Sequence, residues 1–236
     1  MKGIILAGGN GTRLLPLTKV INKAMLPVGG KPAIYHCIEK FTSSGVNDIL
    51  VVCGGNNAGQ FLELLGNGEQ FGLKNLNYVY QPEPLGIAHA LSLAENWAEQ
   101  MPIAVMLSDN MFEDDFADEF KIFEANPHVA KIFLTEVENP EHYGVVELHG
   151  NQVKSIEEKP DNPKSNYIAT GLYLYGSSVW AKIKGLSPSD RNELEITDLN
   201  NMYLKDNILQ AVKLKGYWFD IGENIEGYRR ACNLIK

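Results

Sequence analysis

A glycine-rich segment near the N-terminus constrains this chain more than any other feature. The apolar run Gly3-Ile4-Ile5-Leu6-Ala7 leads directly into Gly8-Gly9-Asn10-Gly11. Continuous apolar runs are typical of buried parallel strands, and ligands bind at the carboxyl ends of such strands. Glycines let the backbone approach an anion closely and direct its N–H groups at it. The segment therefore predicts a cradle for a nucleoside triphosphate, with Arg13 and Lys23 supplying positive charge nearby.

Two familiar glycine motifs do not fit this segment. The dinucleotide fingerprint G-x-G-x-x-G lacks its third glycine, because Gly9 and Gly11 are followed by Thr12, Arg13 and Leu14. The Walker pattern G-x-x-x-x-G-K-[ST] has no match here. The missing glycine argues against a dehydrogenase. A surface turn after the first strand remains the alternative for a short glycine cluster on its own.

Composition narrows the class of protein. The 236 residues are 44% hydrophobic and 21% charged, which suits a globular protein. The formal net charge of -8 and the scattered Lys and Arg residues argue against a nucleic-acid partner. No apolar run approaches the roughly 20 residues of a membrane span. No signal-peptide pattern is present, so a cytoplasmic location without a membrane partner is expected. The three cysteines suggest neither disulfides nor zinc.

Strand and helix patterns alternate without a linker, which predicts one α/β domain with a doubly wound, mostly parallel, mixed sheet. The expected strands are 3–7, 48–53, 76–80, 103–107, 129–137 and 208–214. The expected helices are 31–44, 58–65, 86–99, 115–125, 178–184, 194–205 and about 223–235. Strands 144–148, 153–157 and 168–175 are expected to form a small antiparallel insertion, and 218–222 a turn.

Asp109 is the first candidate metal ligand. It ends an apolar strand and is followed by Asn110. A carboxylate at the end of a parallel strand sits where ligands bind, and Mg²⁺ is usually held by one or two carboxylates plus substrate phosphates. The alternative is a helix cap or a turn residue, both of which Asp also favours.

Two polar segments are candidate substrate contacts. Gln81, in the segment Gln81-Pro82-Glu83-Pro84-Leu85-Gly86, carries an amide that both donates and accepts, so it could pair with a pyrimidine edge. A proline-stiffened loop with a solvated glutamine is the alternative. The second segment is Glu157-Glu158-Lys159-Pro160, in which Lys159 could neutralise an anionic substrate group and Glu158 could accept hydrogen bonds from substrate hydroxyls. Taken alone, the second segment also suits a solvated strand end.

Residues 6–32 closely resemble the signature of the sugar nucleotidyltransferases, L-A-G-G-x-G-T-R-L-x-P-L-T followed by K-x-x-L-P-V. Later segments resemble further motifs of that family in the same order: Gln81 to Gly86, Tyr143 to Glu147, Glu157 to Pro160, Thr170 to Tyr173, Arg191 to Asp198 and Gly216 to Gly222. Two departures are visible. The family's helix begins Gly-Leu-Ala-Gln-Ala where this chain has Gly86-Ile87-Ala88-His89-Ala90, and Asn192 replaces a glycine. The resemblance covers nearly the whole chain.

The resemblance implies a Rossmann-like fold and a role in nucleotide-sugar and polysaccharide biosynthesis. It implies Mg²⁺-dependent transfer of a nucleotidyl group from dTTP to glucose 1-phosphate, a sugar 1-phosphate, with release of pyrophosphate. The same reaction with UTP is one alternative. A catalytically silent nucleotide-sugar sensor is another, although intact Arg13, Lys23, Asp109 and Asp220 argue against it. Whether the chain forms a homo-oligomer stays open.

The resemblance also implies a role for individual residues. The nucleotide-binding set is Leu6, Ala7, Gly8, Gly9, Gly11, Thr12, Arg13, Gln81, Pro82, Gly86 and Asp109. The sugar-phosphate-binding set is Asn110, Tyr143, Gly144, Glu158, Lys159, Thr170, Gly171, Tyr173 and Arg191. Asp109 and Asp220 would hold the metal, and Arg13, Lys23, Asp109 and Lys159 would be catalytic. The single domain would divide into a nucleotide part of about 1–110, a sugar-phosphate part of about 111–222 and a C-terminal helix of about 223–235.

Overall fold

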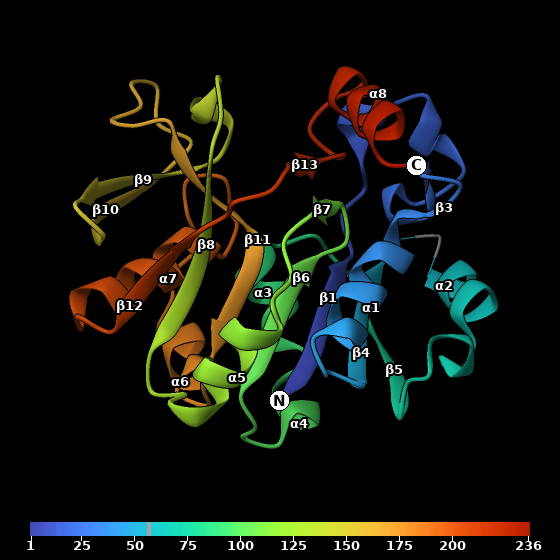
Figure 1. Cartoon of the computed structure of the whole chain (residues 1–236), viewed down its shortest axis with the longest axis horizontal. Coiled ribbons are helices and arrows are strands. Elements are labelled where there is room, and N and C mark those ends of the chain that lie inside the picture. Colours follow the sequence, from blue (N-terminus) through green and yellow to red (C-terminus); the bar gives the residue numbers. More distant parts are fainter. Residues whose placement is uncertain (56–57) are drawn as a thin grey trace.

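A mixed nine-stranded sheet forms the centre of the protein, whose computed structural model describes residues 1–55 and 58–236. Strand β1 (Lys2–Ala7) lies between β4 (Asp48–Gly54) and β6 (Ile103–Leu107), and β5 (Asn75–Gln81) follows β4. These four strands are parallel, so their carboxyl ends meet at one edge of the sheet (Figure 1). Their predicted positions are confirmed to within one residue at either end.

The sheet continues beyond β6 through a long antiparallel strand, β11 (Tyr167–Tyr175). Strand β8 (Ala130–Glu136) pairs with β11, and β12 (Leu209–Lys213) pairs parallel to β8. A hairpin of β9 (Gly144–His149) and β10 (Gln152–Glu158) joins β11 through the pair Ile168 and Val145. Assigning 168–175 to an insertion alone was therefore wrong, because this strand crosses the central sheet and only its start meets the hairpin.

Two short antiparallel pairs complete the strands. Strand β7 (Asn110–Phe112) pairs with β13 (Trp218–Asp220), where the sequence predicted only a turn. Strands β2 (Pro27–Val28) and β3 (Lys31–Pro32) form the other pair. The β7–β13 pair joins segments far apart in the chain, which local sequence patterns do not reveal.

Helices cover both faces of the sheet (Figure 1). One layer contains α1 (Ala33–Ser43), α2 (Ala58–Leu65), α5 (Ala117–Ala125) and α8 (Ile225–Leu234). The other contains α3 (Ile87–Ser92), α4 (Glu95–Ala98), α6 (Val179–Lys184) and α7 (Ile196–Lys205). The single helix expected over 86–99 is divided into α3 and α4, because the Ala94 N–H bonds the Leu91 carbonyl only three residues back.

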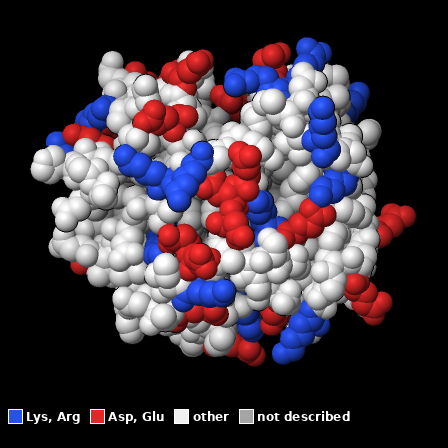
Figure 2. Space-filling model, viewed as in Figure 1, with Lys and Arg blue, Asp and Glu red and all other residues white. Residues whose placement is uncertain are grey.

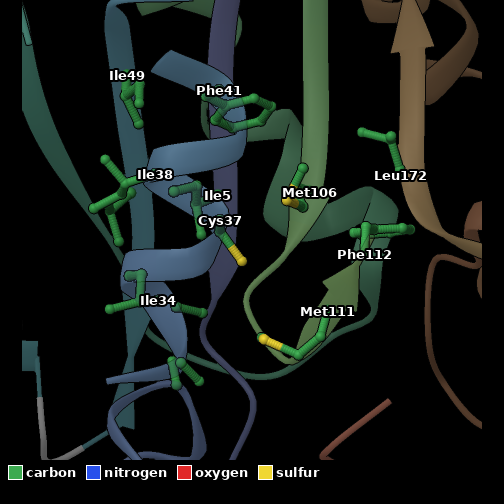
Figure 3. Close-up of a cluster of buried hydrophobic side chains, with 14 of the residues drawn as sticks. Ile5, Ile34, Cys37, Ile38, Phe41, Ile49, Met106, Met111, Phe112 and Leu172 are labelled. Atoms are coloured by element: carbon green, nitrogen blue, oxygen red, sulfur yellow. The ribbon is translucent and has the colours of Figure 1, made fainter. Parts of the chain in front are cut away.

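The alternation of side chains along β1 separates two apolar cores. Ile5 packs in the α1 layer and Ile4 in the α3 layer, and both are fully buried. Figure 3 shows the first core, where Ile34, Cys37 and Phe41 of α1 point toward the sheet. Each such side chain contributes roughly 1.5–3 kcal/mol by leaving water. The two cores fix the sheet rigidly beneath the edge where the parallel strands end.

The surface is mixed in charge. On the face drawn in Figure 2, Lys and Arg side chains are interspersed with Asp and Glu side chains. None of the helices in the described parts of the chain has both the length and the apolar character of a membrane span.

Candidate active site

A cleft lies where the carboxyl ends of β1, β5 and β6 face the β9–β10 hairpin and the start of α7. From the first half of the chain its lining includes Leu6, Gly8, Gly9, Arg13, Lys23, Gln81, Gly86, Asp109 and Asn110. From the second half it includes Tyr143, Gly144, Glu158, Lys159, Gly171, Tyr173, Thr197, Trp218 and Asp220. The fold thus brings most of the residues singled out in the sequence to one place.

The glycines after β1 allow the backbone to pack closely against its neighbours. A Cβ added to Gly8 would lie 2.2 Å from Oε1 of Gln81, and one added to Gly54 would lie 2.9 Å from the Gln81 carbonyl oxygen. A Cβ added to Gly9 would meet nothing nearer than 3.4 Å, the Cε of Lys23. A side chain at Gly8 would therefore push the end of the Gln81 side chain aside, whereas one at Gly9 would make only an ordinary contact with Lys23.

The loop after the glycines is held to β1 by Asn22, a residue that the sequence did not single out. Its Nδ2 donates to the Ala7 carbonyl at 3.1 Å, and its Oδ1 accepts from the Ala24 N–H at 2.9 Å. These two bonds fix the turn Lys23–Met25 and so hold Lys23 at the cleft. Arg13 reaches the same cleft from the turn Thr12–Leu14 and is exposed.

Two carboxylates from distant segments meet beneath the loop. Asp109 is buried and forms an ion pair with Lys23. Its backbone carbonyl accepts from the Ile221 N–H at 2.9 Å, while Asp220 Oδ1 accepts from the Gly222 N–H at 2.8 Å. A Cβ added to Gly222 would lie 2.3 Å from Asp109 Oδ2. The β7–β13 pair thereby places the turn after Asp220 directly against the Asp109 carboxylate.

The charges of Lys23, Asp109 and Asp220 shift one another's pKa values. Loss of water and the nearby charge of Asp109 raise the pKa of Asp220 to about 7, although Lys23 and Arg13 oppose that rise. Burial would also raise the pKa of Asp109, but the Lys23 ammonium outweighs it and holds that pKa below its ordinary value. Burial alone would lower the pKa of Lys23, yet the two carboxylates raise it. The centre therefore carries closely spaced negative charge that a cation would relieve.

The two carboxylates fit a divalent cation that is shared with a substrate. Mg²⁺ is held by one or two carboxylates together with substrate phosphates, seldom by an all-protein cage. Across residues 1–55 and 58–236, no group of three or more His, Cys, Asp and Glu side chains could form such a cage. Asp109 and Asp220, open to the cleft, match the first arrangement.

The far side of the cleft is an ordered polar network around Glu158. Its carboxylate accepts from the Thr197 hydroxyl and, at 3.1 Å, from Arg191 Nη2. Lys159 has a left-handed backbone, with φ of 44°, and its N–H donates to the Tyr143 carbonyl at 2.9 Å. The Tyr143 ring packs edge-on against Trp218, with centroids 5.6 Å apart. Tyr143, Glu158 and Lys159 are thus held together beside Asp220.

Asn110 joins the two sides of the cleft. Its Oδ1 accepts from the Gly171 N–H at 2.8 Å and from Trp218 Nε1 at 2.7 Å, and its Nδ2 donates to Asp109 Oδ1 at 3.2 Å. Because all these partners belong to the protein, the Asn110 side chain positions Asp109 relative to β11 and β13. Asn110 also lines the cleft, so the expected contact with a substrate stays a prediction.

A family model described as nucleotidyl transferase matches residues 2–235, almost the whole chain. The chain belongs to the nucleotidyl transferase family. Membership agrees with the resemblance read from residues 6–32 and with the geometry of the cleft. The doubly wound sheet expected for such a protein is confirmed.

Curated relatives of this nucleotidyl transferase carry a more specific name. A glucose-1-phosphate thymidylyltransferase of Neisseria meningitidis is 42% identical over 240 residues, covering 100% of this chain and 83% of the relative. One of Xanthomonas campestris is 41% identical and covers 100% of this chain and 80% of the relative. The similarity therefore extends through both sides of the cleft.

Solved structures share the fold. A Bacillus anthracis protein described as a glucose-1-phosphate thymidylyltransferase, crystallised with a sucrose, has a TM-score of 0.94 and 43% identity, covering 100% of this chain and 95% of its own. A UDP-glucose pyrophosphorylase bound to UDP-glucose has a TM-score of 0.85 and 26% identity, covering 98% of this chain and 97% of its own.

Some residues expected at the site of this nucleotidyl transferase lie outside the cleft lining. They are Ala7, Gly11, Thr12, Pro82, Thr170 and Arg191. Ala7 packs in the α1 core, and the Thr170 hydroxyl donates to the Phe133 carbonyl at 2.9 Å. Arg191 is bound by Glu195 and Glu158, so it reaches the cleft only through these carboxylates. The contacts of Ala7, Thr170 and Arg191 thus direct these three side chains away from the cleft lining.

Other lining residues of the nucleotidyl transferase were not anticipated, including Thr197 and Trp218. Both lie inside segments that the sequence did mark, 191–198 and 216–222. The acidic residues of those segments are the more obvious candidates for a site. Nothing in the local sequence pattern indicates that Thr197 and Trp218 also face the cleft. Gly86 lines the cleft as expected and also packs closely against the loop that precedes α7, since a Cβ there would lie 2.5 Å from the Leu194 carbonyl oxygen.

Proposed function

We propose that this protein transfers a thymidylyl group from dTTP to glucose 1-phosphate, giving dTDP-glucose and pyrophosphate. One observation carries the proposal: a single cleft combines a glycine-lined cationic side, a carboxylate pair and a polar side with its own cation. A triphosphate and a sugar phosphate both need local positive charge in a protein whose net charge is -8. The names of the relatives that match the full chain support the same reaction.

The triphosphate would lie across the glycine segment. Gly8 and Gly9 let the phosphates approach the backbone, and Arg13 neutralises the pyrophosphate as it leaves. Lys23 is held next to Asp109, where the α-phosphate would lie beside the reacting oxygen. Gln81 faces the base from the end of β5.

Glucose 1-phosphate would occupy the opposite side. Lys159 neutralises its phosphate, and Glu158 accepts from sugar hydroxyls while Thr197 and Arg191 hold the carboxylate in place. A phosphate oxygen of the sugar attacks the α-phosphorus in line, a P–O bond forms, and the bond to the pyrophosphate oxygen breaks. No protein nucleophile is needed, so positioning and charge neutralisation supply the catalysis.

We further propose that the metal is Mg²⁺ and that Asp109 and Asp220 hold it. Bound there, it would neutralise phosphate charge between the two substrates. Arg13, Lys23 and Lys159 would still have the task of holding the two phosphates in line. The buried Lys23 ammonium keeps Asp109 ionised and ready for the cation.

Pyrophosphate release is the test. The purified protein is supplied with Mg²⁺ and each of dTTP, UTP, dCTP, dATP and dGTP, against glucose 1-phosphate and other sugar 1-phosphates. We expect release with dTTP and glucose 1-phosphate to be fastest. Release from no pair would favour the silent-sensor alternative and contradict the proposal.

UTP is the second candidate nucleotide, because the fold matches UDP-glucose pyrophosphorylase over 98% of this chain. Uracil lacks only the methyl group of thymine, and a difference of that size is worth ~1–3 kcal/mol. The ratio of kcat/KM for dTTP to that for UTP decides between them.

A further inference from the structure

His89 lies directly behind the candidate base-binding residue. It belongs to α3, does not line the cleft and is partly buried. Its Nδ1 is 3.2 Å from Nε2 of Gln81, whose side chain is 4% exposed and does line the cleft. Nothing in the local sequence links His89 to Gln81.

In the structure, the amide nitrogen of Gln81 faces Nδ1 of His89. An amide nitrogen only donates, so in this orientation Nδ1 accepts and the ring carries its proton on Nε2, whereas a proton on Nδ1 would turn the amide around. The Gln81 carbonyl then turns the other way, toward Gly8, where a Cβ would lie 2.2 Å from Oε1. Among the hydrogen bonds of residues 1–55 and 58–236, none has Oε1 as its acceptor.

We propose that His89 is the positioning residue that presents the Gln81 carbonyl to the base, and thereby selects thymine or uracil over cytosine. This inference rests on the proposed function, since it takes the base to bind at Gln81. Thymine and uracil carry an N3–H, which a carbonyl accepts. Cytosine carries a bare N3 beside an amino group, so it needs a donor at this point and would leave two acceptors facing each other.

The orientation matters energetically because a glutamine amide is otherwise free to rotate by half a turn. Without a fixed neighbour, either its carbonyl or its amino group can face the base. A buried acceptor that meets another acceptor loses about 1–3 kcal/mol, which is a factor of about 5 to 150 in affinity. With its proton on Nε2, His89 is an acceptor behind Gln81 and therefore favours thymine or uracil, whereas a donor at that place would favour cytosine.

Three substitutions separate these cases. His89→Asp places acceptor oxygens close to the position of Nδ1, His89→Leu places an apolar atom there, and His89→Lys places only donors behind Gln81. The readout is the ratio of kcat/KM for dTTP to that for dCTP, measured by pyrophosphate release with glucose 1-phosphate. Added charge at position 89 affects both triphosphates alike, so the ratio isolates the hydrogen-bond effect.

We expect the ratio to stay within about threefold of wild type in His89→Asp, and to fall by about tenfold in His89→Leu and further in His89→Lys. Ser92→Ala is the matched control, because the Ser92 hydroxyl bonds the His89 carbonyl at 2.7 Å without touching Gln81. Its ratio should equal that of wild type. An equal loss with both nucleotides in His89→Leu and His89→Lys would overturn the proposal, because a purely structural role predicts that pattern.

A second measurement needs neither turnover nor a variant that folds. The ¹⁵N chemical shifts of the His89 ring in the wild-type protein should report an unprotonated Nδ1 and a protonated Nε2. A protonated Nδ1 would overturn the proposal even if dTTP is the substrate. Conversely, absence of turnover by the wild-type protein would contradict the proposed function and leave this tautomer result standing.

Discussion

The two sides of the cleft are built differently. On the nucleotide side, the groups follow the ends of parallel strands, and the loop that carries Lys23 is held by a neighbour in the sequence, Asn22, 15 positions from the carbonyl it binds. On the sugar side, Glu158 is held by Thr197 and Arg191, 39 and 33 positions away. Arg13 is exposed and forms no ion pair with the described residues, whereas Glu158 is already paired.

This difference separates two ways of binding a phosphorylated substrate. A triphosphate brings its own charge, so the protein can leave Arg13 open and let the ligand complete the pairing. A sugar is recognised by hydroxyl geometry, so its acceptors are ordered in advance. Ordering in advance reduces the entropy lost on binding. Changes on the nucleotide side should therefore act on charge and close packing, and changes on the sugar side on positioning.

The largest effect is expected at the carboxylate pair that both sides share. Asp109→Asn keeps the size of the side chain but removes the charge that Lys23 and the metal need. We expect the protein to fold and kcat to fall on the order of 10³-fold, the scale of removing a key electrostatic group. Pyrophosphate release measures kcat, and circular dichroism checks the fold. Activity near that of wild type would rule out the metal role of Asp109.

Close packing on the nucleotide side gives the next effect. In Gly8→Ala, the new methyl group would collide with Oε1 of Gln81 at 2.2 Å. We expect KM for dTTP to rise about tenfold or more as Gln81 moves, with a much smaller change in KM for glucose 1-phosphate. Gly59→Ala is the control, since Gly59 lies in α2 outside the cleft lining and its new methyl group would meet no described atom within 4 Å. Equal effects of the two substitutions would contradict the packing argument.

The third largest effect is expected from removing positive charge on the nucleotide side. Arg13→Ala should raise KM for dTTP severalfold, to about tenfold, and lower kcat, because an exposed cation beside a phosphate is worth on the order of 1 kcal/mol. Lys19→Ala removes an exposed charge from the same loop, outside the cleft lining, and should change neither constant. A nucleotide dependence that is unaltered in Arg13→Ala would count against the cradle.

The smallest effect belongs to the sugar side. Arg191 lies outside the cleft lining and acts through Glu158 and Glu195. We expect Arg191→Ala to raise KM for glucose 1-phosphate about threefold and to leave KM for dTTP unchanged, since half-exposed ion pairs contribute ~0.2–1 kcal/mol. Initial rates at varied concentrations of each substrate measure both constants. A larger change in KM for dTTP would remove the distinction between the two sides.

The same distinction explains how much the sequence revealed. Strand β6 was predicted over its observed range, Ile103–Leu107, because its apolar run and its flanking turns are local signals. The range of β11 in the sequence was also predicted, but its place in the sheet was not. Its antiparallel pairing with β6 involves a strand from another part of the chain, which a local signal does not reveal. The turn predicted at 218–222 became β13 for the same reason.

The residues of the candidate site likewise fall into those that local sequence indicates and those that only tertiary contacts place. The glycine segment, Arg13 and Lys23 could be grouped from one continuous stretch of sequence. The direction of the Thr170 hydroxyl and the contact between His89 and Gln81 depend on neighbouring strands and helices, so no motif could indicate them. Spacing identified the segments that carry the site, and tertiary packing decided which side chain of each segment faces it.

The β7–β13 pair has a consequence for the growing polypeptide. Asn110 and Trp218, which it brings into contact, are 108 positions apart, and Asp220 follows two residues later. Chains are synthesised from the N-terminus, so the triphosphate cradle emerges from the ribosome long before its second carboxylate. If both carboxylates hold the metal as proposed, turnover requires nearly the whole chain to have been synthesised and folded.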